Sequence, residues 1–432
     1  MKSGLHCFVA VLVLALAVRV GVSVFTPVFD TSEARYAAMA ANMARTDDFR
    51  VPRFTYKLTY RPFDGKPPLV FQAGGLCCKA FGVCEFAVRL FPFLCAALLL
   101  LILYRAVARR SDAATARLSV AICATSVSFF AASGIAMTDM TLTVCVAGAL
   151  FAYWRFADDG GFACAAGTAT LLGLGVLAKG PVALALFGVP VLADAAVNRR
   201  WNAVFDRKWL FVAPLFLAIV IPWFVLAEQR NPGSLRYFLL NENLLRFVSH
   251  DYGDRFGTAR EFFPGVSIVW AFVATLPWAL LPLWDIFRRF RKSNNQTIKQ
   301  SNNFPWKSFG FLSLAAITGF WCLTSRALVY YLLPVVPLFA AGLALEGDRE
   351  RLRRFALPCA VLAVLVTAGA FAGGMLFTDK MQGAKTKFSV AVNHYAYEFY
   401  HGTKDEAELR RYREAVAAWL REHPRKEEDA ER

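Results

Sequence analysis

The chain has 432 residues, of which 57% are hydrophobic and only 19% are charged. Soluble domains average about 45–50% apolar and about 25% charged residues, so the composition excludes an ordinary soluble domain. The formal net charge is +16. In a soluble chain this charge would suggest nucleic-acid binding, but here the basic residues gather in short loops between apolar runs. That pattern is typical of cytoplasmic loops of membrane proteins, so we expect no nucleic-acid partner.

Long apolar runs recur along the chain, and about 20 residues suffice to cross the hydrocarbon core of a bilayer. Because a single run in lipid satisfies its backbone polar groups as a helix, we predict an all-α polytopic membrane protein with about eleven transmembrane helices. The first run, with Arg19 late in a long apolar stretch, is interpreted as a transmembrane helix and not as a cleaved signal peptide. The runs are 8–25, 86–104, 118–132, 140–154, 163–177, 182–197, 210–226, 262–283, 309–323, 329–345 and 355–377.

The charge of the loops predicts the topology. Basic loops at 105–117, 199–208, 288–299 and 349–354 should face the cytoplasm. The long loops 26–85 and 228–261 and the tail 378–432 then lie outside the cytoplasm, so we divide the chain into a transmembrane domain, 1–377, and a short extracytoplasmic tail. In the first outer loop, residues 33–45 have helical periodicity and Leu69–Phe81 follows Pro67-Pro68, which suits a helix start. We expect both segments to be amphipathic helices in the membrane interface.

Ionisable side chains collect on the predicted outer face, where each is a functional candidate because charges near a membrane are costly. Moving a sugar off a phosphate needs a carboxylate to deprotonate the acceptor hydroxyl and cations to neutralise the departing phosphate. A charge at a helix end can also simply mark the water boundary, but Asp139 and Lys179 each stand alone in a long apolar stretch. The candidates are Asp30, Glu33 and Asp139 as acids, and Arg35, Lys66, Lys179 and Arg326 as cations.

Seven stretches carry a resemblance that covers about the first 340 residues. In chain order they are SEARYAAMAANMARTDDFRVPRF, RPFDGKPPLVF, FGVCEFAVRLFPFL, SGIAMTDMTLT, LGVLAKGPVAL, IPWFVLAEQRNPGSLRYFLLNENLLRF and SRALVYYLLPVVP. Together they resemble the membrane glycosyltransferases of the GT-C fold, and among them the ArnT-like lipid A aminoarabinose transferases and the dolichyl-phosphate-mannose-protein mannosyltransferases. The resemblance implies an inverting enzyme of the bacterial plasma (inner) membrane, acting on its extracytoplasmic face. It would move a hexosyl or pentosyl group from a polyprenyl-phosphate donor to lipid A, another glycolipid or a protein hydroxyl.

The resemblance also implies roles for the acidic residues. In the family an acidic pair stands before Ala/Thr-Arg-Tyr-Ala, and its first member is the proposed base. Here Glu33 matches the second member, while Ser32 takes the place of the first and Asp30 lies two residues earlier. Either Asp30 or Glu33 is therefore the predicted catalytic base, and Asp139 matches the second acidic site of the family.

The donor phosphate should be bound by residues that match the family's cationic and aromatic positions: Arg35, Tyr36, Lys66, Lys179, Arg326 and Tyr330. The family's Glu-Lys-Pro-Pro is Gly65-Lys66-Pro67-Pro68 here, so a divalent metal ion, the one cofactor left open, would depend on Asp64 and His250. No organic cofactor is expected.

Two other classes of protein stay open. A scaffold that kept the fold but lost activity would explain the departures at Ser32 and Gly65. A lipid-linked sugar flippase or transporter would show broken mid-membrane helices and repeated halves, whereas the polar residues here crowd one face and no repeat is evident.

Overall fold

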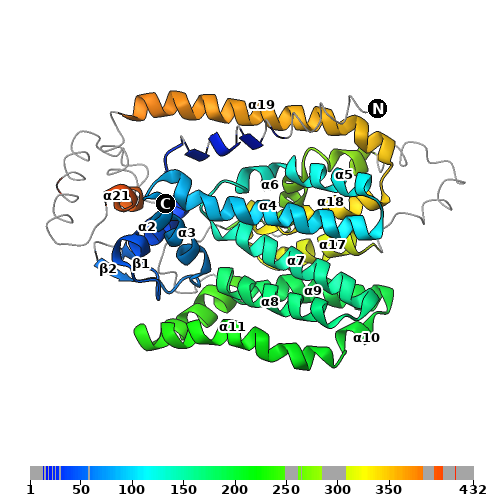
Figure 1. The fold of residues 1–432 in the computed structure, drawn as a ribbon, viewed down its shortest axis with the longest axis horizontal. Helices are drawn as coiled ribbons and strands as arrows, with labels where there is room; N and C mark the ends of the chain where they lie inside the picture. Colours follow the sequence, from blue (N-terminus) through cyan, green and yellow to red (C-terminus); the bar gives the residue numbers. More distant parts are fainter. Residues whose placement is uncertain are drawn as a thin grey trace, which may run out of the picture.

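A computed structural model describes residues 31–56, 59–248, 261–263, 265–284, 308–382 and 394–401, and also residues 13, 16–17, 19–21, 23–24, 26–28 and 414. This part of the chain is built from helices together with a two-stranded antiparallel hairpin, β1 (Arg53–Tyr56) and β2 (Thr59–Pro62). Figure 1 shows an elongated bundle whose longer helices run along its long axis, with the hairpin and several short helices at one end.

Helices make up most of the described part of the chain. In chain order they are α2 (Thr31–Thr46), α3 (Leu69–Phe81), α4 (Glu85–Arg110), α5 (Ala113–Ala124), α6 (Val127–Ala132), α7 (Thr138–Asp159), α8 (Phe162–Lys179), α9 (Val182–Asn198), α10 (Trp201–Val204), α11 (Lys208–Arg230), α12 (Ser234–Arg236), the π-helix η1 (Tyr237–Leu245), α13 (Arg246–Val248), α14 (Val266–Thr275), α17 (Phe309–Cys322), the 3₁₀-helix η3 (Val329–Leu332), α18 (Val335–Glu346), α19 (Arg349–Gln382) and α21 (His394–His401).

The fold class predicted from the sequence is confirmed. By length and composition, four helices of the described ranges are long and apolar enough to cross a membrane: α4, α7, α8 and α11. Six further apolar helices there are shorter, α3, α5, α9, α14, α17 and α18, so the number of about eleven spans stays a prediction. Large aliphatic and aromatic side chains on α4 and α11, such as Leu98, Leu210 and Phe211, are exposed, as expected for surfaces that face lipid tails.

Helix α7 forms the centre of the bundle and packs against α4, α8 and α9. Most of its side chains are buried. At Gly148 a β-carbon would lie 3.1 Å from Leu171 of α8 and 3.4 Å from Ile102 of α4, so the missing side chain lets three helices approach closely. Small residues serve this purpose in membrane helices, where packing drives association. The middle of α7 is therefore packed closely between α4 and α8.

Several predicted spans are interrupted, among them 118–132 and 262–283. The run 118–132 forms α5 and α6, separated at Thr125 and Ser126. The hydroxyls of these residues donate hydrogen bonds to the carbonyls of Ala121 and Ile122, and such local bonds compete with the helical ladder. The run 262–283 contains α14, which ends at Thr275, two residues before Pro277.

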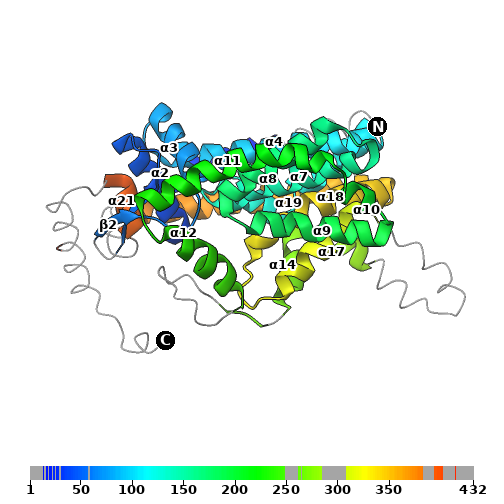
Figure 2. The same ribbon diagram turned by 90° about the horizontal axis from the view of Figure 1, so that it is seen from below.

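A second, smaller core lies at the end of the bundle that carries the hairpin. Helix α2 packs against α3 and α21 there, and Figure 2 shows the same grouping from below. A β-carbon at Gly75 of α3 would lie 3.0 Å from the Ala40 carbonyl of α2. The predicted helices 33–45 and Leu69–Phe81 agree with α2 and α3, whereas the hairpin and α21 were not predicted.

Candidate active site

The first charged pair of the site joins the ends of two neighbouring helices. Asp139 is the second residue of α7 and Lys179 is the last residue of α8. Lys179 Nζ donates a hydrogen bond to Asp139 Oδ1, and both side chains are almost fully buried. An acid at a helix N-terminus and a base at a helix C-terminus each oppose the partial charge of that helix end. The structure thus brings together two of the predicted site residues.

Aromatic rings surround the Lys179 ammonium group. Its Nζ lies 4.2 Å from the ring centre of Tyr331 and 5.8 Å from that of Tyr330, both in η3. The next residue, Gly180, has a φ of +95°, and a β-carbon there would lie 2.4 Å from the Phe238 ring. Glycine alone fits this conformation and this space. The turn after α8 therefore packs directly against η1, and this contact fixes the position of Lys179.

The π-helix η1 supplies a second charged cluster. Glu242 is buried and accepts hydrogen bonds from Lys66 Nζ at 3.0 Å, Arg246 at 3.1 Å and the Tyr237 hydroxyl at 3.2 Å. Tyr237 and Glu242 stand five residues apart, the spacing that the i→i+5 pattern of a π-helix favours. Arg246 also donates to the Tyr331 hydroxyl at 3.3 Å. Because Tyr331 also contacts Lys179, the Glu242 cluster and the Asp139–Lys179 pair form one network.

Burial and charge act on the titration of this network. Burial lowers the pKa of Lys66 below 10.5, although Glu242 opposes the shift. Burial alone would raise the pKa of Glu242, but the positive charges of Lys66 and Arg246 bring it below 4.5. Near neutral pH, Glu242 is therefore ionised, and Lys66 is more easily deprotonated than an exposed lysine.

Three further predicted residues border the same region. Arg326 donates to Glu261 at 2.8 Å and to the backbone carbonyl of Arg246 at 3.4 Å. The Arg35 guanidinium carbon lies 5.5 Å from the ring centre of Tyr36. Burial raises the pKa of Tyr36 above 10.0, and the charges of Arg35, Lys179 and Asp139 also act on it. Tyr36 therefore lies within the electric field of the Asp139–Lys179 pair.

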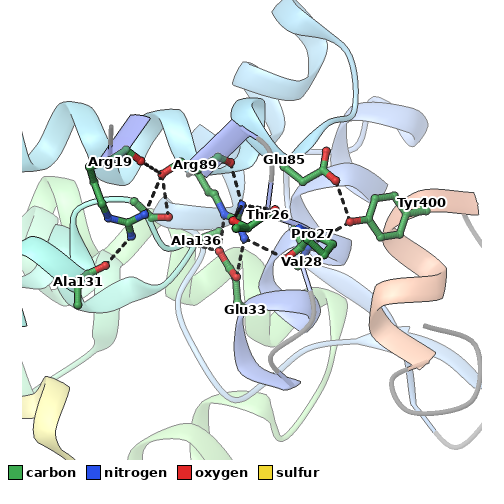
Figure 3. A network of polar contacts seen from close by, with 12 residues as sticks. Arg19, Thr26, Pro27, Val28, Glu33, Glu85, Arg89, Ala131, Ala136 and Tyr400 are labelled. Carbon is green, nitrogen blue, oxygen red and sulfur yellow. Dashed lines mark hydrogen bonds and ion pairs between the residues drawn. The ribbon is translucent and has the colours of Figure 1, made fainter. Parts of the chain in front are cut away.

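Glu33 lies in a different environment from that of a free base. Its carboxylate forms a bidentate ion pair with Arg89 of α4, at 2.7 and 2.9 Å, and also accepts from the Ala136 backbone N–H at 3.0 Å. Glu33 is 5% exposed and Arg89 is 4% exposed. Arg89 donates further to the backbone carbonyls of Ser23 and Thr26. This arrangement ties α2, α4 and the loop before α7 together (Figure 3).

The same network continues on both sides in Figure 3. Arg19 donates to the carbonyls of Phe130 and Ala131 at the end of α6, where a helix leaves carbonyls without intrahelical partners. On the other side, the Tyr400 hydroxyl of α21 donates to Glu85 at 2.9 Å. The network therefore links the ends of several helices.

Two predicted residues fall outside the part of the chain that the structure describes: Asp30 and His250. Asp64, the other predicted metal ligand, borders a small cavity of about 20 Å³ beside Trp223 and Phe238. Within the described ranges, no group of three or more His, Cys, Asp or Glu side chains is placed to hold a metal ion. Because His250 lies outside the described residues, a divalent metal ion at this position stays a prediction.

Several residues of these networks were not predicted from the sequence, among them Arg89, Glu242, Arg246 and Tyr331. Arg89 is a lone charge near the start of an apolar run, the same signal that singled out Asp139 and Lys179. Glu242 and Arg246 are four residues apart in an aliphatic stretch. Tyr331 directly follows the predicted Tyr330.

This fold is known from solved structures. ArnT from Cupriavidus metallidurans bound to undecaprenyl phosphate matches with a TM-score of 0.66 at 21% identity, over 96% of this chain and 74% of that chain. The apo crystal structure of the same protein matches with a TM-score of 0.64 at 22% identity, over 97% and 74% of the two chains. The described helices thus define a polytopic membrane protein of the GT-C fold.

The sequence places it more narrowly. The profile of the dolichyl-phosphate-mannose-protein mannosyltransferase family matches residues 5–238, more than half of the chain, and the chain belongs to this family. The undecaprenyl phosphate-alpha-4-amino-4-deoxy-L-arabinose arabinosyl transferase of Edwardsiella ictaluri is 32% identical over 222 residues, 50% of this chain and 39% of that protein. The protein of the same name from Enterobacter sp. is 28% identical over 272 residues, 60% and 47% of the two chains. The chain spans less than half the length of these relatives.

Proposed function

We propose that the protein is an inverting membrane glycosyltransferase that transfers a sugar from a polyprenyl-phosphate donor to an acceptor outside the cytoplasm. The observation that carries this proposal is the cationic network at one end of the bundle, formed by Lys66, Lys179, Arg246 and Arg326. Four cations beside a set of apolar helices match a ligand that joins a phosphate to a lipid chain.

The pairing of each lysine with a carboxylate supports a specific use of this network. Lys179 is bonded to Asp139 and Lys66 to Glu242. A donor phosphate that binds the lysines competes with these carboxylates for the same N–H donors. When Lys179 turns to the phosphate, Asp139 gains a free acceptor oxygen, which can orient the acceptor hydroxyl.

We assign the role of general base to Asp30 and not to Glu33. The Glu33 carboxylate already accepts three hydrogen bonds and is held by a buried arginine, so it acts as a positioning residue. In the proposed step, the acceptor oxygen attacks the anomeric carbon from the face opposite the phosphate. The proton passes to Asp30 while the carbon–oxygen bond to the phosphate breaks, and the polyprenyl phosphate leaves with the electron pair. The cations then neutralise the leaving group.

The names of the relatives favour an undecaprenyl-phosphate donor that carries aminoarabinose or a related sugar. Lipid A, another glycolipid and a protein hydroxyl are the candidate acceptors. The basic loops support a bacterial inner-membrane location with the site on the extracytoplasmic face. Residues of two such loops, Arg110 and Arg200, pair with Asp158 at the end of the bundle opposite the site.

The test is sugar transfer in membranes, with radiolabelled polyprenyl-phosphate sugars and each acceptor class supplied separately. The wild type is compared at matched abundance with Asp30→Asn, Lys179→Ala and, as a control of equal charge change at the opposite end, Asp159→Asn. We expect Asp30→Asn to lower turnover by about 10²–10⁴-fold, the usual contribution of a general base, with donor binding kept. Lys179→Ala should weaken donor binding, and Asp159→Asn should change neither.

Two results would overturn the proposal. Normal turnover by Asp30→Asn would remove the assigned base. A wild type that binds the carrier but transfers no sugar to any acceptor class would favour the scaffold interpretation instead.

A further inference from the structure

The end of the bundle opposite the proposed donor site contains a polar cavity. Its volume is about 360 Å³, within the roughly 300–1,000 Å³ that is usual for ligand sites. Helices α7, α9, α17 and α18 line it near their ends on the side of the basic loops. The proposed transfer reaction uses none of its residues.

The floor of this cavity holds a buried acid. Asp194 of α9 is 1% exposed. Its Oδ1 accepts a hydrogen bond from Asn198 at 2.8 Å, whereas its Oδ2 is buried and has no hydrogen-bond partner among the described residues. The Ser308 hydroxyl, which also lines the cavity, is buried in the same unsatisfied state. A buried acceptor without a donor is costly, so these two oxygen atoms indicate a ligand that donates hydrogen bonds.

The rim of the cavity carries two arginines, Arg110 and Arg200, together with the exposed carboxylate of Glu346. Arg110 and Arg200 are both bonded to Asp158, so this group of three has a net charge of +1. The Arg110 guanidinium also lies 3.5 Å from the ring centre of Trp154, and Trp154 stacks on Phe309 at 5.0 Å. One wall of the cavity is therefore apolar and aromatic, and both guanidinium groups keep N–H donors beyond those used by one carboxylate.

The apolar wall continues along α17 and α18. A β-carbon at Gly310 would lie 2.6 Å from the Leu338 carbonyl, and one at Gly342 would lie 3.3 Å from the Phe311 ring. The two helices therefore meet at glycines that also line the cavity. Because side chains there would fill the space or push the helices apart, the cavity depends on this close crossing.

From the buried acid, the two arginines of the rim and the apolar wall, we infer a binding site for a phosphoethanolamine group, as in phosphatidylethanolamine. Its primary ammonium would donate to Asp194 Oδ2 and Ser308 Oγ, and its phosphate would lie at Arg110 and Arg200. A lipid with an anionic headgroup and no ammonium, such as phosphatidylglycerol, would satisfy the rim but would place no cation at Asp194. The site is thus selective for a ligand that carries both charges.

The test is native mass spectrometry of the full-length protein in detergent, with phosphatidylethanolamine and phosphatidylglycerol of identical acyl chains added in equal amounts. We expect the wild type to retain phosphatidylethanolamine at least about tenfold better, which corresponds to about 1.4 kcal/mol. Asp194→Asn and Ser308→Ala should each reduce this preference, Asp194→Asn to near unity. Asp159→Asn, which removes an exposed acid at the same end of the bundle and outside the cavity, should keep it.

Soluble phosphoethanolamine separates the two sources of this headgroup. If it displaces the bound lipid at millimolar concentration, the headgroup alone occupies the site. If the lipid remains bound, the acyl chains are also needed, and both results support the site. Equal retention of the two lipids by the wild type, or an unchanged preference in a folded Asp194→Asn protein, would overturn the inference and leave a water-filled cavity. Ser308→Ala covers the case in which Asp194→Asn does not fold.

Discussion

Removing the charge of Glu33 should destabilise the protein more than it impairs the chemical step. In Glu33→Gln the carboxylate that holds Arg89 becomes an amide. One oxygen can still accept from Arg89, but the new NH₂ group faces a guanidinium that can only donate. Because both residues are at most 5% exposed, the arginine charge stays buried without its counter-ion. Breaking a buried pair in this way costs about 3–5 kcal/mol.

The assay for this prediction is SDS-induced unfolding in mixed micelles, followed by tryptophan fluorescence. Arg89→Gln should cost a similar amount, and the double variant should be more stable than the sum of the two single losses predicts, because it leaves no unpaired buried charge. Donor binding and turnover are measured on the folded fraction of each protein. A Glu33→Gln protein of normal stability that binds donor normally and has lost turnover would refute the reasoning and make Glu33 the base.

Lys66, Gly180 and Arg45 provide three further tests. Burial lowers the pKa of Lys66, so its positive charge is present at low pH and is lost as the pH rises through a value below 10.5. Donor binding, measured by carrier titration, should weaken as this charge is lost. The Lys66→Arg protein should still bind the donor at the same pH, because arginine stays charged. Gly180→Ala would place a methyl group 2.4 Å from the Phe238 ring in a left-handed conformation; we expect weaker donor binding through displacement of Lys179, and unchanged binding would contradict this. Arg45→Ala removes hydrogen bonds to two carbonyls near the end of α21, so limited proteolysis should cut the tail faster, at a cost of about 1–3 kcal/mol in docking of the tail.

Apolar run length and helical periodicity predicted the membrane fold and the helices α2 and α3, because these signals are local. The hairpin was missed because β1 and β2 have four residues each, too few for an alternating pattern to be recognised. Helix α21 was missed because its stability depends on contacts with α2, more than 340 positions away along the chain.

Lone charges in apolar stretches pointed to Asp139 and Lys179, and the structure pairs these two residues. The partners of Lys66 could not be deduced, because Glu242 is 176 positions away and its orientation depends on a π-helix. Glu33 and Arg35 were both candidates because they are charged residues of the first outer loop, and the resemblance implied their roles. Geometry separates them, since Glu33 is held by Arg89 while Arg35 packs among aromatic rings.

The contact of α21 with α2 sets an order for the assembly of the protein during synthesis. Asn42 and Arg45 of α2 bind Glu398 and Phe399, which follow the long helix α19 in the chain. The ribosome makes α2 first and α21 much later. The face of α2 that contacts α21 is therefore without this partner while the intervening helices insert. A nascent chain halted before residue 394 would expose this face, and its degradation would distinguish unfinished molecules from finished ones.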